Sequence, residues 1–278
     1  MTHTQVSVFQ LYKLTPNMIT VRSSDFAKFT GHNPYCKKNE AFDIFWSRNP
    51  ALARRLSVKY TPQKWSRLET QLTNSSKTEI EQFCDSVGAE TIKDACEIVK
   101  RNVITPAVKS DTNTVVTEVV EKTTTNIPST FIESIKQDVQ ISRGIKREKG
   151  NIENFESKSK MVVTEQNSQL FEKKITVWKQ YEVLLVGKVD GISRDKDGNH
   201  IIIEVKERRN RLFSNLVDYE KVQLHCYMVL TDIKKAILIE RFDDETNEYD
   251  ITFDEDFWKE CLSNFSNFLN TIQIDNLC

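Results

Sequence analysis

The sequence predicts an α/β (α+β) protein in which helices flank a central mixed β-sheet, with a mostly helical part at the N-terminus. Three observations predict this class. Apolar residues recur at helical spacing through much of residues 23–101, and residues 181–206 read as two strands joined by a polar turn. Strand and helix patterns then follow one another to the C-terminus, which is typical of a sheet covered by helices.

The composition limits the possible functions. The chain has 278 residues, enough for one large domain or two small ones. Its 39 Lys and Arg residues nearly balance 40 Asp and Glu residues, so any nucleic-acid site must be a local patch. The first residues lack the features of a signal peptide, and no apolar run is long enough to span a membrane. We therefore expect an intracellular protein, cytoplasmic or nuclear and not secreted, without membrane contact.

The 6 cysteines are scattered and form no CxxC pair, which predicts free thiols in a reducing compartment. A first short helix is expected to begin around Arg22–Asp25, with Ser or Asp as its cap, and to stop at Gly31. Residues 105–130 are rich in Thr, Val and Glu and predict either an exposed loop or irregular β structure. Further helical patterns occupy residues 38–48, 62–73, 77–87 and 91–101.

A longer helix is predicted over residues 140–157. Its apolar positions are Ile141, Ile145, Ile152 and Phe155. Glu148 falls within that stripe, and burying its charge costs several kcal/mol unless the carboxylate is paired or binds a metal. The alternative is a slightly rotated helix with Glu148 at the edge of the stripe.

The stretch from Tyr181 to Lys206 contains the main candidate catalytic residues. An apolar run ends at Asp190, a turn-forming segment follows, and a second strand begins at His200. Alternation along that strand puts Ile201, Ile203 and Val205 on one face and Ile202, Glu204 and Lys206 on the other. Asp190 closes the neighbouring strand, so we expect its carboxylate beside Glu204. Two carboxylates and a lysine at strand ends favour a divalent-metal hydrolase.

The remaining segments supply more elements. Residues 161–179 predict one or two strands, residues 213–230 a helix, residues 235–241 a strand, and Asp254 the cap of a final helix. Within the helix of residues 213–230, Gln223 and Tyr227 are four apart and lie on one side.

Four motifs in chain order resemble a known superfamily: RGIKREKGNIENFE (143–156), VDG (189–191), EVK (204–206) and QLHCY (223–227). Together they resemble the PD-(D/E)XK nucleases, in the branch of lambda exonuclease, the YqaJ viral recombinases and the RecB nuclease domain. Arg143, Gly144 and Glu148 match an RG-x3-E motif, and Glu204 follows Asp190 by 14 positions in a D-x(n)-ExK pattern. The resemblance covers roughly residues 17–241, with an insertion across about 50–138.

The resemblance implies a single nuclease domain over residues 1–278. Residues 139–278 would form a restriction-endonuclease-like catalytic core, and residues 1–138 a helical part with an insertion. One or two Mg²⁺ (or Mn²⁺) ions are expected on Glu148, Asp190, Glu204 and the backbone carbonyl of Val205. Lys206 would position the attacking water, Gln223 would hold Lys206 or the phosphate, and Tyr227 would pack beside it.

The implied activity is a 5′-to-3′ exonuclease that degrades duplex DNA ends in recombination or replication, in a viral setting. The alternatives on the same fold are a structure-specific endonuclease, an RNase, or an inactive relative that only binds nucleic acid. Expected partners are duplex ends or single strands of DNA and a single-strand annealing protein, and the resemblance allows an oligomer.

Contacts to DNA need local positive charge. Two clusters of lysine and arginine residues supply this charge, although a run of charged residues is also typical of a surface that only faces water. The helix start at residues 22–24 is a further candidate, for a terminal 5′-phosphate. The expected nucleic-acid-binding residues are Arg22, Ser23, Ser24, Arg143, Lys146, Arg147, Arg208, Arg209 and Arg211.

Overall fold

The computed structural model describes residues 17–61, 75–103, 129–164, 166, 168–208, 211–242 and 244–272. The helix predicted at 62–73 and nearly all of the segment 105–130 lie outside these ranges. Within the described helices, some side chains are also outside the description, among them those of residues 136–143, 145 and 146.

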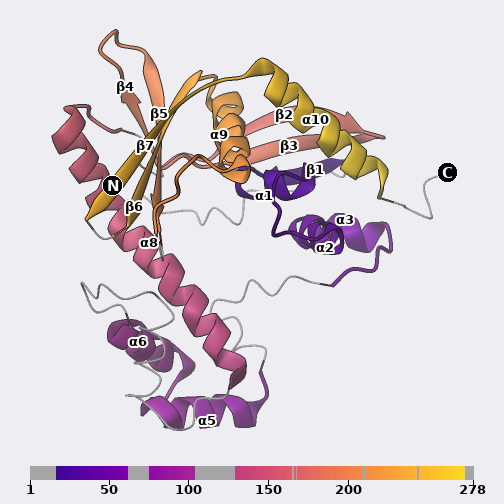
Figure 1. The fold of residues 1–278 in the computed structure, drawn as a ribbon. Coiled ribbons are helices and arrows are strands. Elements are labelled where there is room, and N and C mark those ends of the chain that lie inside the picture. Colours follow the sequence, from indigo (N-terminus) through magenta and orange to yellow (C-terminus); the bar gives the residue numbers. More distant parts are fainter. Residues whose placement is uncertain are drawn as a thin grey trace, which may run out of the picture.

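The strands form two sheets flanked by helices, which confirms the α+β class (Figure 1). The first sheet has the order β1-β3-β2, with β1 parallel to β3 and β2 antiparallel to it. The second has the order β4-β5-β6-β7, in which only β5 and β6 are parallel. The strands are β1 (Met18–Arg22), β2 (Phe171–Trp178), β3 (Tyr181–Gly187), β4 (Gly191–Arg194), β5 (His200–Glu207), β6 (Lys235–Phe242) and β7 (Glu245–Thr252).

The strands are thus divided between two sheets, and the expected two-stranded hairpin over residues 181–206 is corrected. The run that begins at Tyr181 ends as β3 at Gly187 and pairs with β1 and β2, not with β5. The partner of β5 is the short strand β4, after Asp190. Gly191 is required at this switch, because a Cβ there would come within 2.2 Å of Val163 Cγ1. Asp190 thus lies in the link between the two sheets.

Helices cover both faces of the second sheet. The helices of the described residues are α1 (Ser23–Phe29), α2 (Lys38–Arg48), α3 (Pro50–Arg55), α5 (Lys77–Val87), α6 (Ile92–Val103), α8 (Ser129–Ser159), α9 (Asp218–Thr231) and α10 (Glu255–Asn270). Helix α8 packs with Ile152 and Phe155 on the face formed by Ile201, Ile203 and Val205. Ile202 faces the main core with α9, so the predicted alternation along β5 is confirmed.

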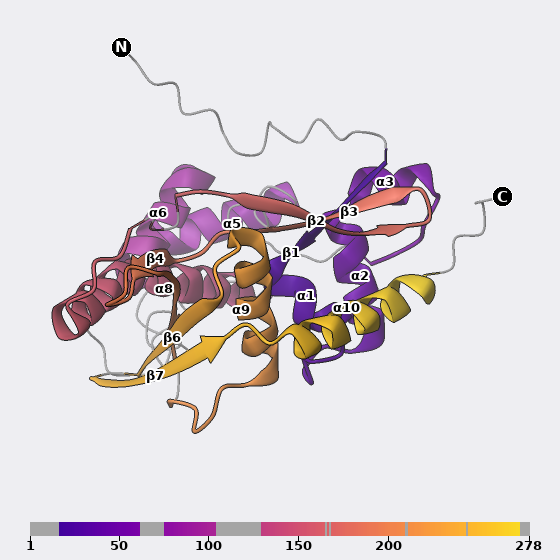
Figure 2. The ribbon, with the colours of Figure 1, turned by 90° about the horizontal axis from the view of Figure 1, so that it is seen from above.

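Helix α9 lies where the two sheets meet. It packs against β2 and β3 of one sheet and against β5 and β6 of the other (Figure 2). Helix α1 runs beside α9, and α10 packs its aromatic side against α1 through Phe26, Trp258 and Phe265. The core of the protein is thus centred on α9, and its inner side chains are fixed from several directions.

Capping explains several helix boundaries. At the start of α5, the Ser76 side chain accepts a hydrogen bond from the backbone N–H of Glu79, and the Glu79 side chain accepts one from the backbone N–H of Ser76. The helix ends at Gly88, which has a φ of 69°. Asp254 caps α10 as predicted, accepting from the N–H groups of residues 256 and 257. Helix α1 differs from expectation: its N-cap is Arg22, which makes no side-chain capping bond.

Two helix predictions had wrong boundaries. Helix α8 begins at Ser129 rather than Gln140, because Phe131 and Ile135 pack against α5 and α6. Helix α9 begins at Asp218 rather than Phe213, because the Phe213 backbone is hydrogen-bonded to the second sheet instead. In both cases contacts remote in sequence decide where the helix starts.

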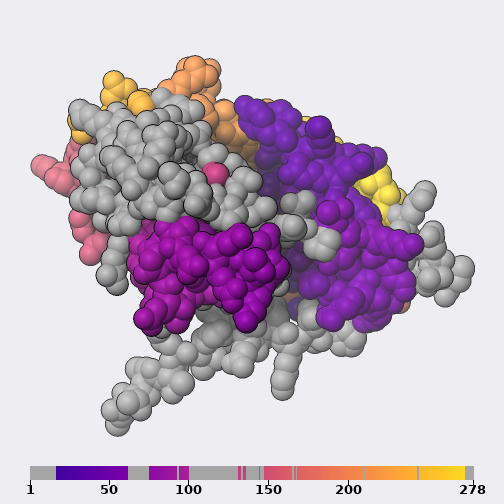
Figure 3. Space-filling model, turned by 90° about the horizontal axis from the view of Figure 1, so that it is seen from below, coloured from indigo at the N-terminus to yellow at the C-terminus, as the bar shows by residue number. Residues whose placement is uncertain are grey.

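Helices α5 and α6 form their own small core with the first turns of α8, around Phe83, Cys96 and Phe131. This group lies at the N-terminal end of α8, away from both sheets (Figure 1), and it faces the reader in Figure 3. Of the helices the structure describes, none combines the length and apolar character needed to cross a membrane.

Candidate active site

Glu204 is the centre of the site. It points from β5 toward α9 and is 2% exposed. Its Oε1 accepts from Lys206 Nζ at 2.5 Å and from Gln223 Nε2 at 3.3 Å. Its Oε2 is buried and has no hydrogen-bond partner. A buried carboxylate oxygen without a hydrogen-bond partner lowers the stability of the folded protein. This oxygen is therefore either an uncompensated cost to folding or an atom that binds a ligand.

Lys206, Gln223 and Tyr227 complete a hydrogen-bonded group around that carboxylate. Lys206 Nζ donates to Gln223 Oε1 at 3.3 Å, and Gln223 Nε2 donates to the Tyr227 hydroxyl at 2.7 Å. The spacing of four residues in α9 stacks Gln223 on Tyr227, as the sequence indicated. The side chain of Lys206 keeps 25% of its surface exposed, so the ammonium group can meet a ligand from solvent.

Asp190 is the second carboxylate. Its Oδ2 accepts from the backbone N–H of Val205 at 2.9 Å, which ties the link between the sheets to β5. Asp190 also lies near enough to Glu204 for its negative charge to act on the Glu204 carboxyl group. The structure therefore brings together the two acids that the sequence predicted as neighbours.

Electrostatics follow from this crowding. Burial, together with the negative charge of Asp190, raises the pKa of Glu204 to about 8, although Lys206 opposes the shift. Burial alone would lower the pKa of Lys206, but the Glu204 and Asp190 carboxylates outweigh it and raise that pKa. Lys206 therefore stays cationic, and Glu204 holds a proton more readily than an exposed glutamate does.

Tyr227 and Ser23 form the wall on the other side of the carboxylates. Burial and the two carboxylates raise the pKa of Tyr227 well above its usual value, so the phenol stays neutral. A side-chain hydrogen bond joins Tyr227 to Ser23, which is 3% exposed. Gly187 makes room for it, because a Cβ there would come within 2.5 Å of Ser23 Oγ. Ser23 is thus a buried part of the site, while Arg22 and Ser24 are exposed.

Glu148 is not gathered with the other two acids. It is half-buried on α8, next to Arg147, whose guanidinium pairs with Glu207 at the end of β5. Over the residues described, no three Asp, Glu, His or Cys side chains form a group that could hold a metal ion. The third ligand that the resemblance implied stays a prediction.

Arg208 does not have the position expected of a DNA contact. Its guanidinium donates two bonds to Glu220, at 2.6 and 2.7 Å, and a third to Glu240. It also lies 4.1 Å from the centroid of the Phe213 ring, and its side chain is only 11% exposed. Arg208 therefore belongs to an internal ion-pair network, and we remove it from the candidate DNA contacts.

The other predicted basic residues divide into two sets. Arg211 is exposed and Arg147 is partly exposed, so both can reach a ligand. Arg209 and the side chains of Arg143 and Lys146 lie outside the described residues.

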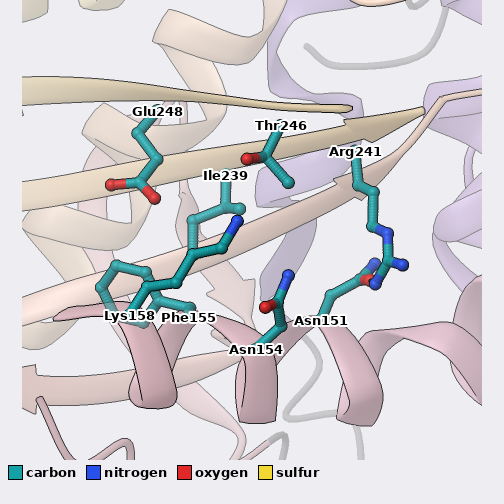
Figure 4. Close-up of a pocket in the computed structure, with 8 residues that line it drawn as sticks. All are labelled: Asn151, Asn154, Phe155, Lys158, Ile239, Arg241, Thr246 and Glu248. Carbon is teal, nitrogen blue, oxygen red and sulfur yellow. The ribbon is translucent and has the colours of Figure 1, made fainter. Parts of the chain in front are cut away.

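A shallow polar recess lies behind the site, between α8 and strands β6 and β7 (Figure 4). Arg241 donates to Asn151 Oδ1 at 2.7 Å, and Asn151 Nδ2 donates to Glu207 at 3.0 Å. Figure 4 shows Arg241 reaching from β6 toward Asn151 on α8. These residues belong to the α8 face of the sheet, so the recess is separate from the Glu204 carboxylate.

Sequence reasoning missed Ser23 as a partner of Tyr227, and Glu220 and Glu240 as partners of Arg208. Ser23 is a small polar residue two positions before Asp25, and nothing in the sequence around it indicates that its side chain is buried. The two glutamates lie 12 and 32 positions from Arg208, and only the fold brings them together.

The residues present fit a divalent cation. Two carboxylates lie side by side, and Glu204 Oε2 has no protein donor in a buried position. Hard cations such as Mg²⁺ prefer carboxylate oxygens. A cation held by these two acids would offset both the repulsion that raises the pKa of Glu204 and the cost of its unpartnered oxygen.

Comparison with known proteins adds the following. No family model matches the chain, and no curated protein matches it. Among solved structures, an alkaline exonuclease from Laribacter hongkongensis aligns at 16% identity and a TM-score of 0.36, covering 69% of this chain and 91% of that one. The same exonuclease, also solved in complex with dAMP, aligns at 15% identity, a TM-score of 0.35 and the same coverage.

A phage-related exonuclease from Haemophilus somnus aligns at 12% identity and a TM-score of 0.37, covering 91% of this chain and 94% of that one. The protein SSO0001 aligns at 21% identity and a TM-score of 0.37 over 51% of this chain, and the match spans only 66% of SSO0001. Likenesses of this size carry no functional argument.

Proposed function

We propose that this protein is a metal-dependent nuclease that hydrolyses phosphodiester bonds in DNA, working from duplex ends. The observation that supports the proposal most is the Glu204 carboxylate: it is buried, adjacent to Asp190, held by Lys206 and Gln223, and has one unpartnered oxygen. A residue needed only for folding would have both oxygens satisfied.

Asp190 and Glu204 are the proposed ligands of the cation, with the Val205 carbonyl and Glu148 as the further ligands that the motif resemblance supplies. A divalent cation there offsets phosphate charge and assists deprotonation of the attacking water. Glu148 is on the turn of α8 next to Arg147, which contacts the end of β5 at Glu207.

Lys206 has the role of a fixed cation. Its ammonium is held by Glu204 and Gln223, and its raised pKa keeps it charged at neutral pH. It can therefore orient a water molecule or offset the charge that develops on the phosphate as water adds to phosphorus and the P–O bond to the leaving oxygen breaks. Gln223 keeps this ammonium in place, and Tyr227 keeps Gln223 in place.

The proposed DNA contacts are the exposed Arg22, Ser24 and Arg211, together with Arg147. The surroundings of Ser23 favour a role in the wall of the site over a direct phosphate contact. We propose residues 139–278 as the catalytic core of a single nuclease domain. An annealing-protein partner and an oligomer stay predictions.

A digestion time course tests the proposal. Linear duplexes with 5′-phosphate or 5′-hydroxyl ends are incubated with Mg²⁺ or with EDTA, and labels at either end report the direction of degradation. The proposal expects Mg²⁺-dependent shortening from the 5′ end, abolished by EDTA. No degradation of any duplex or single strand in Mg²⁺ or Mn²⁺ would contradict the nuclease proposal.

The substrates also separate the alternatives. Cleavage of closed circular DNA would replace the exonuclease proposal with an endonuclease. Degradation of RNA in preference to DNA would show that the substrate is RNA and that the protein is an RNase. In either case Glu204 and Lys206 would remain the residues whose loss stops cleavage.

A further inference from the structure

Tyr35 is an unusually exposed aromatic side chain on an ordered turn. It is 81% exposed, the largest exposure among the large hydrophobic residues that the structure describes. The turn is tied down, because Asn33 N donates to Ala27 O at 3.1 Å and Tyr35 N donates to Asn33 Oδ1 at 3.0 Å. The ring is therefore held out into solvent by the fold.

The Tyr35 ring lies against a second tyrosine. Its centroid is 6.3 Å from that of Tyr219, at an interplanar angle of 69°. Tyr219 packs on the main core, so it serves as the fixed partner of the pair. An edge-to-face arrangement, combined with 81% exposure, leaves a face of Tyr35 open.

The pair lies beside the candidate active site. Tyr219 precedes Gln223 by four residues in α9, so Tyr219, Gln223 and Tyr227 form one column along the helix, with about 5–6 Å between successive Cβ atoms. Gln223 is the residue that contacts both Lys206 and Glu204. Glu220, next to Tyr219, acts electrostatically on Lys206 and pairs with Arg208 behind it.

Exposed cationic side chains lie close in sequence to both members of the pair. Lys37 and Lys38 follow Tyr35 after Cys36 and are exposed, and Arg211 is exposed in the segment that leads into α9. An open aromatic face interleaved with cationic side chains is the arrangement that proteins use to bind single-stranded nucleic acid. The base stacks on the ring while lysine and arginine hold the backbone.

We propose that Tyr35 and Tyr219 form a stacking platform for an unpaired nucleobase next to the scissile phosphate. The inference builds on the proposed function and names the form of its substrate: the strand enters the site with at least one base unpaired and stacked on Tyr35. A stacked base contributes about 1–3 kcal/mol, which corresponds to roughly a 5- to 150-fold change in affinity.

The test is binding in EDTA, where no cleavage is expected. The probe is a duplex with a short single-stranded overhang that carries 2-aminopurine at its unpaired end, and quenching of its fluorescence reports stacking. Tyr35→Ala and Tyr35→Leu are expected to lose the quench and to raise Kd at least about 5-fold. Tyr35→Phe keeps the ring and is expected to stay within about twofold of wild type.

Val162→Ala is the matched control, because Val162 is another exposed apolar residue (71%) outside the site. It is expected to leave quench and Kd unchanged, and the unfolding midpoint of each variant confirms that it is folded. The platform is overturned if wild type shows no quench, or if Tyr35→Ala binds and quenches like wild type. Binding that depends on Tyr35, in a protein that cuts no DNA in Mg²⁺, supports the platform and overturns the proposed function.

Discussion

Two buried glutamates on neighbouring strands, Glu204 and Glu240, show how this protein separates folding from function. They lie on the parallel strands β5 and β6, where Glu240 is in register with Lys206 and Glu204 with Leu238. Both are buried, at 2% and 0% exposure. Glu240 has both oxygens satisfied, one by Arg208 and the other by the Phe213 N–H.

Glu204 differs from Glu240 in two respects. Its Oε2 has no partner, and burial beside Asp190 raises its pKa to about 8. A folded protein tolerates such a cost where the residue has another task, whereas a carboxylate with both oxygens paired, as in Glu240, serves the fold. The contrast teaches that burial alone does not mark a functional carboxylate, and that the unsatisfied oxygen is what sets Glu204 apart from Glu240.

The largest expected effect is on activity at Glu204. Glu204→Gln keeps the shape of the protonated side chain but removes the charge that the cation needs, so DNA cleavage should fall at least about 10²-fold. The free energy of unfolding in EDTA at neutral pH should stay within about 1 kcal/mol, because a carboxyl group with a pKa of about 8 is already mostly protonated there and the amide keeps its shape. Cleavage assays and denaturant unfolding measure the two. Cleavage at the wild-type rate would end the assignment of Glu204.

The next effect is on stability at Glu240. Glu240→Ala leaves the buried Arg208 with only part of its counter-charge and releases the Phe213 N–H, so unfolding should become easier by about 3 kcal/mol. For a chain of this length that lowers the unfolding midpoint by about 6–12 °C. Calorimetry measures it.

Glu182→Gln is the control for that prediction. It breaks an exposed pair with Lys174, joined at 2.6 Å, and should change stability by less than about 1 kcal/mol. If Glu240→Ala were no more destabilising than Glu182→Gln, the contrast between the two buried glutamates would fail.

A smaller effect on activity is expected at Gln223, which joins the two functional groups without being a ligand. Gln223→Ala removes the bonds to Lys206 and Glu204, and a hydrogen bond to a charged group contributes about 1.5–3 kcal/mol. We expect kcat to fall about 10- to 100-fold with little change in KM. An unchanged kcat would show that the position of Lys206 does not depend on Gln223.

The smallest effect is a pH dependence of stability from His225, a buried group on α9 with both ring nitrogens engaged. They contact Lys221 O at 2.8 Å and the Asp254 N–H at 3.1 Å, the arrangement of a neutral ring. Burial lowers its pKa from the usual 6.5, with a further lowering from the Lys221 charge and opposition from the Lys221 carbonyl and Asp254. The unfolded chain therefore binds a proton that the folded protein does not.

The contribution of His225 to the free energy of unfolding is therefore fully present above pH 6.5. As the pH drops below 6.5 toward the lowered pKa of the folded state, the free energy of unfolding decreases by at most about 1.4 kcal/mol per pH unit. Unfolding free energies measured from pH 7.5 to pH 5 test this. His225→Gln should reduce the slope. An identical slope in the variant would assign the acid sensitivity to other groups.

The sequence predicted the parts of the site that depend on local pattern. Alternation along β5 correctly put Glu204 and Lys206 on one face, and the spacing of four stacked Gln223 on Tyr227. The glycine after Asp190 indicated a break in the strand pattern, although the strand itself ends earlier, at Gly187. These features depend on neighbours within a few residues, which is the range that periodicity reports.

The features that sequence did not predict depend on remote partners. Strand β7 has polar residues at most positions and lies at the edge of its sheet, so it lacks an apolar alternation. The basic residues after Lys206 read as one charged surface run, but Arg208 turns inward because Glu220 and Glu240 meet it there. The start of α8 depends on its contact with α5 and α6.

The central claim, that Asp190 and Glu204 hold a divalent cation, is tested most directly by unfolding in the presence of metal. The midpoint of thermal unfolding is measured for wild type, Glu182→Gln and Glu204→Gln as Mg²⁺ or Mn²⁺ is raised from zero. At a concentration of about 100 times Kd, binding stabilises the folded state by about 2.7 kcal/mol, which corresponds to roughly 5–10 °C here. The account predicts that shift in wild type and Glu182→Gln and its absence in Glu204→Gln; an equal shift in all three proteins would contradict it.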